Sequence, residues 1–277
     1  MCTLVVIKNV FPGYPLVVAA NRDEQFSRPS AAPAVAGDPR KVLSPTDLRR
    51  GGTWIGVNDA GVLVALTNRK SIASVRGLRS RGELVAEALT RPTAKEALST
   101  VIGRKPGEHN ACFMVIADPA EGFTVAGNGV GGQDEAGCEA APGFVHDPLP
   151  DGLSIVTNLG LGAGSPRGAG IMREWEKLSG SRLPPPRFSA FIPMLTRHEG
   201  ERLSERFRGR EQAALCLHPT EDDADYGTVS SSVIRLSQTH GAAPMVWHYW
   251  HGSRRPGKPS ACHVRWSDLL TLPIRSD

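Results

Sequence analysis

The chain begins with MCTLVV (residues 1–6), which places a cysteine directly before a run of leucine and β-branched residues. Residues 2–7 have the composition of a β-strand that starts almost at the terminus. Chain ends are usually loose, so a strand here would fix the position of its first side chain. From position alone, Cys2 is interpreted as a small apolar residue in a core strand. Only residues elsewhere in the chain can indicate a chemical role for Cys2.

The composition is that of an ordinary globular protein. Of 277 residues, 40% are hydrophobic and 22% are charged, and the formal net charge of +4 is too small to argue for a nucleic-acid partner. The five cysteines are widely scattered, which argues against a disulfide framework, a CxxC redox pair and a zinc site. The apolar start lacks the basic region of a signal peptide, and no stretch reaches the length of a transmembrane segment. We therefore expect a cytoplasmic protein.

The first half of the chain has the pattern of strands and two short helices. Ser80 with Glu83, and Thr93 with Glu96, have the spacing of capping boxes, so we expect one helix through residues 88–89 and a second that ends at Gly103. The Pro- and Arg-rich stretch 28–52 is expected to be a loop. Strands are predicted at 2–7, 16–20, 53–57, 62–67, 112–117 and 122–126, with a hairpin turn at 58–61.

The second half returns from helices to strands. Helices are predicted near 171–178 and 189–195, separated by three prolines at 184–186. Strands are predicted at 153–157, 228–236, 245–250 and 261–266. The chain has no internal repeat and no linker long enough to divide it. Strands, then helices, then strands predict one α+β domain over residues 1–277, with packed sheets.

Two conspicuous motifs favour structural interpretations. GNGVGG (127–132) matches the dinucleotide-binding pattern, but no helical period follows it, so it is interpreted as a glycine turn. WHYWH (247–251) is rich in metal ligands, yet His248 and His251 would point to opposite faces of a strand. Aromatic packing at a sheet edge is therefore the preferred interpretation of the second motif.

Polar residues that follow apolar strands are the more informative signal. AANRDE (19–24) runs from a buried-looking strand into four polar residues, where Arg22 and Asp23 would point in different directions. Asn68 and Asn158 each follow an apolar strand in an apolar-Thr-Asn setting. Each asparagine alone is typical of a turn, but an amide can also stabilise an oxyanion. Together with Cys2, these residues provide a nucleophile, a charged pair and two oxyanion donors.

Several stretches together resemble one known family. They are MCTLVV (1–6), LVVAANRDEQFSRPS (16–30), GGTWIGVNDAGVLVALTNRK (51–70), SRGELV (80–85) and YGT (226–228). The combination resembles the NRDE family, which is the family of transport and Golgi organisation protein 2. The resemblance implies the fold of N-terminal-nucleophile hydrolases, a four-layer αββα sandwich of two mostly antiparallel sheets. It also implies kinship with choloylglycine hydrolase and penicillin acylase.

The resemblance assigns roles to the polar residues. It implies that Met1 is removed and that Cys2 becomes the nucleophile, with Arg22 and Asp23 beside it and Asn68 and Asn158 on the oxyanion side. Asp23 would orient the amine, and Arg22 would pair with a substrate carboxylate or hold Asp23. The family often has an arginine after YGT. Here Val229 follows, so Arg235 is the candidate substitute.

An N-terminal cysteine carries its own base in the α-amino group, so this chemistry requires no separate histidine. A free thiol has a pKa of about 8.5, so little thiolate exists at neutral pH. The α-amino group has a pKa of about 7.8, so roughly one in seven is neutral at pH 7. The implied reaction is hydrolysis of a non-peptide amide in a small-molecule or acyl ligand, without a cofactor or a metal.

A carrier function is the alternative. The resembled family is also associated with haem trafficking and with acyl-CoA or lipid handling, and a fold does not guarantee catalysis. In that case the same cleft would hold the ligand, and Arg22 would contact a propionate or phosphate. His248 and His109 are candidate contacts for haem, although no motif selects them.

Overall fold

The structure is a computed structural model with two seven-stranded sheets at its centre. It describes residues 2–69, 74–129, 132–133, 139–140, 142–162, 164, 166–179, 188–196, 215–217, 225–237, 245–251 and 260–262. Within these ranges, no helix is both long enough and apolar enough to cross a membrane.

The first sheet is organised around the N-terminal strand. A hairpin of β1 and β2 lies near its middle, and strands from much later in the chain, β12 and β14, flank that hairpin. All neighbouring strands in this sheet are antiparallel. In spatial order the strands are β13 (Gly160–Leu161), β12 (Gly152–Thr157), β1 (Thr3–Phe11), β2 (Tyr14–Gln25), β14 (Tyr226–Leu236), β15 (Val246–His251) and β16 (Ser260–Cys262).

The second sheet is an antiparallel meander in which most neighbours in space are also neighbours in sequence. A separate hairpin of β9 (Gly132–Gln133) and β10 (Glu139–Ala140) lies outside both sheets. In spatial order the strands of the meander are β11 (Phe144–Pro148), β8 (Gly122–Gly127), β7 (Cys112–Ala117), β6 (Leu63–Asn68), β5 (Ile55–Asn58), β4 (Val42–Asp47) and β3 (Ser30–Ala36).

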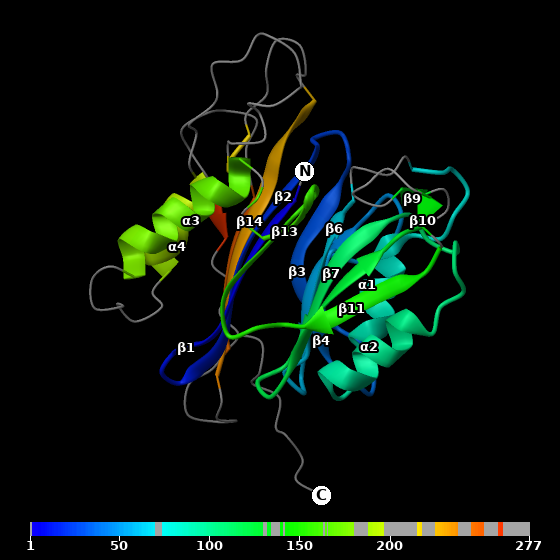
Figure 1. Ribbon diagram of the computed structural model, residues 1–277, viewed down its shortest axis with the longest axis horizontal. Coiled ribbons are helices and arrows are strands. Elements are labelled where there is room, and N and C mark those ends of the chain that lie inside the picture. Colours follow the sequence, from blue (N-terminus) through cyan, green and yellow to red (C-terminus); the bar gives the residue numbers. More distant parts are fainter. Residues whose placement is uncertain are drawn as a thin grey trace, which may run out of the picture.

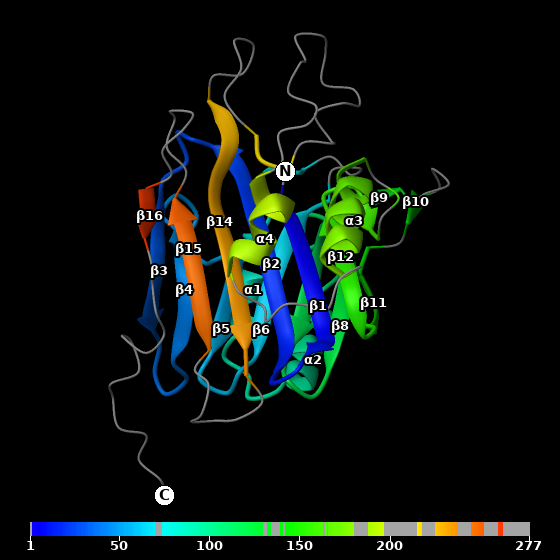
Figure 2. The ribbon, with the colours of Figure 1, turned by 90° about the vertical axis from the view of Figure 1, so that its left-hand side faces the viewer.

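Helices cover the outer face of each sheet. α1 (Arg81–Ala88) and α2 (Ala94–Ile102) pack on the second sheet, and α3 (Pro166–Ser179) and α4 (Phe188–Thr196) pack on the first. Figure 1 shows the two helix pairs on opposite sides of the sheets, and in Figure 2 α3 and α4 lie in front of the first sheet. The predicted four-layer αββα sandwich is therefore confirmed.

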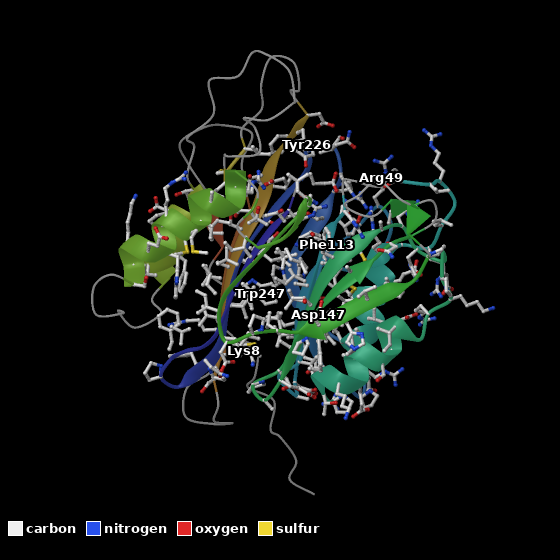
Figure 3. The ribbon with its side chains drawn as sticks, in the orientation of Figure 1. Lys8, Arg49, Phe113, Asp147, Tyr226 and Trp247 are labelled. Atoms are coloured by element: carbon white, nitrogen blue, oxygen red, sulfur yellow. The ribbon has the colours of Figure 1, made fainter. Side chains whose placement is uncertain are left out.

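The layers are held by three groups of buried side chains. The largest lies between the sheets and includes Phe113 of β7 and Trp247 of β15 (Figure 3). A second group joins the meander to α1 and α2, and a third joins the first sheet to α3 and α4. Burial of apolar surface on both faces of each sheet accounts for the continuous β-branched runs in the sequence.

Alternation along β1 assigns one face of the strand to each layer. Leu4 and Val6 pack between the sheets, whereas Val5 and Ile7 pack toward α3 and α4. Because side chains alternate along a strand, Cys2 shares the inner face with Leu4 and Val6. The first side chain before β1 is thus directed to the space between the sheets.

The expected loop over residues 28–52 is wrong, because this stretch contains β3 and β4. The alanines and the proline of β3 are poor strand formers. However, β3 is the edge strand of its sheet, where Pro33 removes no essential ladder hydrogen bond. A register shift between Ala31 and Ala34 accommodates the proline. The short strands β9, β10, β11 and β13 also have no counterpart in the sequence-based prediction.

β2 is longer than predicted and runs through the polar residues as far as Gln25. The prediction ended it at Ala20 because Asn, Arg, Asp and Glu are unusual in a central strand. Pairing with β14 continues to the end of β2, where Gln25 is opposite Tyr226. This pairing keeps the polar residues in extended conformation, so they alternate between the two faces of the sheet.

Most other predicted elements are confirmed with small changes at their ends. Ser80 and Thr93 are the N-caps of α1 and α2, and their side chains accept backbone N–H groups from Gly82 and Glu96. The glycine motif leads into β9 rather than into a helix. β15 lies one strand in from the edge, so the expectation of edge packing for WHYWH is wrong. Trp247 and Tyr249 of that motif are buried between the sheets.

Candidate active site

The strand register brings the predicted residues together around Cys2. Thr3 of β1 is opposite Asn21 of β2 on one side and opposite Thr157 of β12 on the other. In antiparallel strands, one step back along β1 corresponds to one step forward along each neighbour. Cys2 is therefore flanked by Arg22 and Asn158, although these residues are far apart in sequence.

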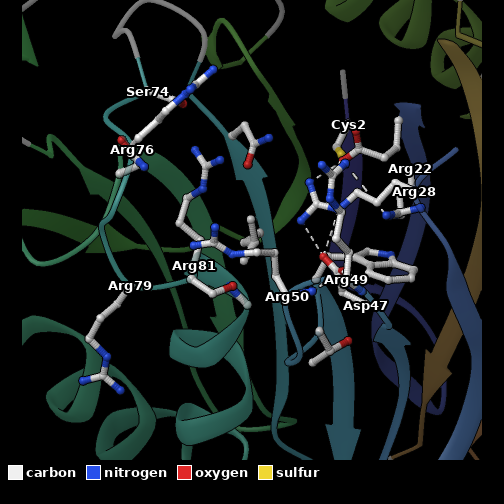
Figure 4. Close-up of a pocket in the computed structure, with 18 of the residues that line it drawn as sticks. Cys2, Arg22, Arg28, Asp47, Arg49, Arg50, Ser74, Arg76, Arg79 and Arg81 are labelled. Atoms are coloured by element: carbon white, nitrogen blue, oxygen red, sulfur yellow. Dashed lines mark hydrogen bonds and ion pairs between the residues drawn. The ribbon is translucent and has the colours of Figure 1, made fainter. Parts of the chain in front are cut away.

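A cavity of about 670 Å³ opens at this end of the sheets. Cys2 and Arg22 line it (Figure 4). Asn68, Trp54 and Leu66 also line it. These residues come from the ends of three different strands and from the segment before β5. The structure thus offers a thiol, a guanidinium and an amide to one ligand, beside a small apolar surface.

Arg22 points into the cavity from the inner face of β2. Its side chain is only 5% exposed, and its guanidinium carbon lies 4.2 Å from the centre of the Trp54 ring. Nη2 is 4.0 Å from the Glu24 carboxylate, and Nη1 has no hydrogen-bond partner among the described residues. A buried N–H group without a partner is unfavourable unless a ligand accepts it.

Asp23 faces the other side of the sheet and is held by a polar network. One carboxylate oxygen accepts from Thr228 Oγ1 at 2.7 Å, and the other accepts from Arg167 Nη1 at 2.9 Å. Arg167 also donates to Thr3 Oγ1 at 2.8 Å, and Tyr226 donates its hydroxyl to the Asp23 carbonyl. The carboxylate therefore fixes the end of β2 from behind the cavity.

The thiol of Cys2 is protonated at rest. Desolvation raises its pKa above the usual value, and the negative charge of Asp23 acts in the same direction. The positive charge of the N-terminus, the backbone N–H of Asp23 and the charge of Arg22 oppose this rise in pKa but do not overcome it. A nucleophilic role for Cys2 therefore requires a base that removes the thiol proton during the reaction.

The two predicted oxyanion residues lie next to each other but differ in orientation. Asn68 is exposed and lines the cavity. Asn158 is 3% exposed, and its side-chain amide donates to the backbone carbonyl of Asn68. The amide oxygen of Asn158 has no partner in the described part of the chain. One N–H of Asn158 is thus engaged, so an oxyanion would use its second N–H or the amide of Asn68.

Arg167 is a site residue that the sequence did not indicate. It lies in the first turn of α3 and is 3% exposed, and it forms an ion pair with Asp23. No motif distinguishes it from the many other arginines, because its proximity to Asp23 depends on how α3 packs against the first sheet. Thr228, of the YGT motif, is the other missed partner of Asp23.

Arg235 does not take the place of the late arginine near Asp23. In the pairing of β14 with β2, Ser230 is opposite Arg22, whereas Arg235 is opposite Val17. These five strand positions correspond to about 17 Å. Arg235 instead lies over the ring of Tyr14, at 5.4 Å. The guanidinium that contacts Asp23 comes from Arg167.

Of the two histidines proposed as haem contacts, only His109 has a described side chain, and it is not found at the cavity. His109 is 4% exposed, does not line the cavity, and has both ring nitrogens without a partner among the described residues. Burial lowers the pKa of its imidazole. The side chain of His248 is outside the described part of the structure. Cys2 is the only sulfur or imidazole ligand among the described residues that line the cavity.

Comparison of the sequence with protein families gives a direct assignment. The family model described as transport and Golgi organisation 2 matches residues 1–139. The chain belongs to this family. A member from Bos taurus, named transport and Golgi organization protein 2 homolog, is 46% identical over 108 residues. The match covers 38% of this chain and 39% of that relative, so the chain spans about two fifths of the length of the curated relatives it matches.

Solved structures are similar to this family member over most of its chain, beyond the residues that the family model matches. An N-acylethanolamine-hydrolyzing acid amidase ortholog from Caenorhabditis elegans has a TM-score of 0.54 and 13% identity, covering 84% of this chain and 92% of that chain. A variant of conjugated bile acid hydrolase from Clostridium perfringens has a TM-score of 0.56 and 10% identity, covering 95% and 92%. At such identities the likeness shows the fold alone, which is that of N-terminal-nucleophile hydrolases.

Proposed function

We propose that this chain is a hydrolase of non-peptide amides that uses Cys2 as an N-terminal nucleophile. The observation that carries the proposal is the strand register, which puts Cys2 between Arg22 and Asn158, with Cys2 and Arg22 lining the cavity. A thiol, a buried guanidinium with an unpartnered N–H and the carboxamide of Asn68 line that cavity. The carboxamide of Asn158 donates to the Asn68 carbonyl from behind it. This set can bind a carbonyl compound and stabilise the negative charge that develops on its oxygen.

The proposed reaction begins with the removal of Met1, which frees the α-amine of Cys2. In its neutral form the amine accepts the thiol proton, and the sulfur attacks the amide carbon. The tetrahedral oxyanion accepts hydrogen bonds from the side chains of Asn68 and Asn158. When the intermediate collapses, the C–N bond breaks and the leaving amine takes the proton. Water then attacks the thioester, releases the acid and restores the thiol.

Arg22 and Asp23 have different parts in this proposal. Arg22 faces the cavity and would bind an acidic group of the substrate. Asp23 keeps its carboxylate behind the sheet, where it contacts Arg167 and Thr228. Its effect on Cys2 would come through the rigid end of β2 and through its backbone N–H. Asp23 is thus a positioning residue in this mechanism.

Ligand binding without catalysis is the second candidate function. The raised pKa of Cys2 and the strongly cationic lining of the cavity would suit a carrier for an anionic acyl or lipid ligand. Haem would have Cys2 as its nearest ligand in the cavity and Arg22 as a partner for a propionate. Haem titration followed by absorbance, in wild type and in Cys2→Ala, tests this candidate.

The enzymatic proposal is tested by mass and turnover together. We expect the purified protein to lack the mass of Met1 and to cleave members of a panel of small acyl amides. Cys2→Ala and Cys2→Ser should keep the fold but lose turnover, since a hydroxyl is much less acidic than a thiol. Retained Met1, or unchanged turnover in Cys2→Ala, would overturn the assignment of the nucleophile.

A further inference from the structure

The lining of the cavity is unusually rich in arginine. Among the described residues, seven arginines line it, compared with two carboxylates and no lysine. Such an excess of like charge around one space is unfavourable in the absence of counter-charge. The lining arginines are Arg22, Arg28, Arg49, Arg50, Arg76, Arg79 and Arg81, and the carboxylates are Glu24 and Asp47.

Arg28 uses both carboxylates of the cavity. Its guanidinium contacts Asp47 at 2.5 Å and Glu24 at 3.2 Å. Burial alone would raise the pKa of Asp47, but the hydrogen bonds from Arg28 and from the backbone N–H groups of Arg49 and Arg50 hold it below its usual value. Asp47 is therefore charged and neutralises Arg28, and Glu24 is shared between Arg28 and Arg22.

Arg79 is neutralised outside the cavity. It pairs with Glu83 at 3.0 Å and with Glu108 at 2.9 Å, and it also contacts Glu87. These three carboxylates belong to α1 and to the segment before β7. Arg79 is consequently part of a surface ion network and is not expected to bind a ligand.

Three other arginines form what we call the arginine wall, defined as Arg50, Arg76 and Arg81. Figure 4 shows Arg76 and Arg81 on the side of the cavity opposite Cys2 and Arg22. Arg50 donates to the carbonyl of Leu78 at 3.1 Å, and Arg81 donates to the carbonyl of Ala111 at 2.9 Å. In the described part of the chain, none of the three has an ion pair with a carboxylate.

Carbonyl anchoring leaves the charge of the arginine wall uncompensated. A carbonyl holds a guanidinium in place but does not neutralise it, and the remaining N–H groups stay available. Burial lowers the pKa of the Arg81 guanidinium, which means that its charge is partly desolvated. A bound anion would relieve this penalty.

Phosphate fits the arginine wall better than a single carboxylate does. The fork of a guanidinium matches two phosphate oxygens, and a phosphate or diphosphate carries enough charge to serve several arginines. The first turn of α1 adds to this effect, because Ser80, Arg81 and Gly82 line the cavity where the helix dipole favours an anion.

We propose that the arginine wall binds a phosphate or diphosphate group carried by the ligand of this cavity. The location of the reactive carbonyl at Cys2 rests on the proposed function, whereas the anion site does not depend on catalysis. Substrates would then be acyl compounds in which a phosphate group is separated from the carbonyl by the width of the cavity.

Calorimetric titration with inorganic pyrophosphate tests the site. We expect wild type to bind, and Arg76→Gln/Arg81→Gln to bind at least roughly tenfold more weakly, because charge-assisted contacts are lost. Arg76→Gln alone should show part of the loss of pyrophosphate binding. This variant removes an exposed side chain that anchors no backbone group among the described residues.

Arg173→Gln is the matched control, since Arg173 is an exposed arginine on α3. No binding by wild type, or equal binding by the double variant, would overturn the proposal.

Vesicle binding distinguishes the two sources of the phosphate group. Phosphatidylcholine vesicles with and without phosphatidic acid are compared in a sedimentation assay. Phosphatidic-acid-dependent binding that the double variant loses supports a lipid headgroup, and pyrophosphate binding without it supports a soluble ligand. If wild type binds neither pyrophosphate nor vesicles that contain phosphatidic acid, the proposal is overturned.

Cys2→Ala separates this proposal from the catalytic one. The variant should bind pyrophosphate as wild type does, because the arginine wall lies across the cavity from the thiol. Loss of turnover with intact pyrophosphate binding is the expected result. Amide turnover in a wild-type protein that does not bind pyrophosphate would overturn the anion site alone.

Discussion

The ion pair of Asp23 and Arg167 is the most consequential contact between single residues in this structure. Both side chains are nearly completely buried, and each is also hydrogen-bonded to a threonine. Two nitrogens of Arg167 have no other partner in the described part of the chain. Removal of one member of such a pair leaves the other as an uncompensated buried charge.

Arg167→Met should therefore destabilise the fold by roughly 3–5 kcal/mol. Urea unfolding of Arg167→Met, Asp23→Asn and the double variant measures the effect, with Arg173→Met on the same helix as the control. The double variant should be more stable than the sum of the single losses implies, because it removes both charges. Equal stability of Arg167→Met and Arg173→Met would contradict the importance of this pair.

Cys112 provides a prediction about pH. Burial raises the pKa of its thiol to about 11. Because the folded state holds the proton more tightly than the unfolded state, this contribution is complete below about pH 9 and is lost as the pH rises toward 11. The free energy of unfolding should fall by roughly 2–3 kcal/mol over this range. In Cys112→Ala, the free energy of unfolding should depend less on pH between about pH 9 and 11. Parallel plots of unfolding free energy against pH for the two proteins would refute the role of Cys112.

At the scale of elements, the close approach of the segment before β5 to α1 shapes the wall of the cavity. Gly52 has a φ of +71°, and a Cβ placed there would lie 2.5 Å from the backbone of Gly82 in the first turn of α1. Gly51 has a φ of +68° but no atom within 4 Å of such a Cβ. Both glycines therefore have the left-handed backbone conformation, but a side chain would make a steric clash only at Gly52.

Gly52→Ala should destabilise the protein more than Gly51→Ala does. Gly51→Ala meets only the penalty of the left-handed conformation, about 1–2 kcal/mol. Gly52→Ala adds a clash with backbone atoms that cannot move without shifting α1. Thermal unfolding of the two variants gives the comparison, and equal melting temperatures would show that α1 can yield at this point.

The sequence predicted those helices and strands whose own residues have a clear pattern. The β-branched runs of β1 and β7 and the caps Ser80 and Thr93 are such patterns, and they predicted strands and helices correctly. β3 was missed because its stability comes from pairing at a sheet edge rather than from its own residues. The same distinction applies to the site, since the NRDE motif indicated Arg22 and Asp23, whereas Arg167 reaches Asp23 only through the packing of α3.

For the whole molecule, the first sheet joins distant parts of the chain. The family model ends at residue 139, yet β1 pairs with β12 and β2 pairs with β14, both of which come later. The hairpin of β1 and β2 would have two unpaired edges in a chain that stopped there. The region matched by the family model is thus not a structural unit.

A fragment of residues 1–139 should fail to fold cooperatively. It would lack both neighbours of the β1–β2 hairpin and the helices that cover it, and an unpaired two-stranded hairpin is only marginally stable. Circular dichroism and urea unfolding of the fragment, next to the full chain, measure this. A sharp unfolding transition in the fragment would refute the expectation.

The separation of β1 from β12 also sets an order of events during synthesis. Thr3 meets Thr157 only after the intervening chain has left the ribosome. At about 5–20 residues per second, roughly 150 residues take about 8–30 s. During this interval the first residues have no partner on the β12 side and remain accessible to an aminopeptidase. If Met1 is removed as the proposed function requires, its removal would therefore precede closure of the sheet around Cys2, because the second half of the chain folds later.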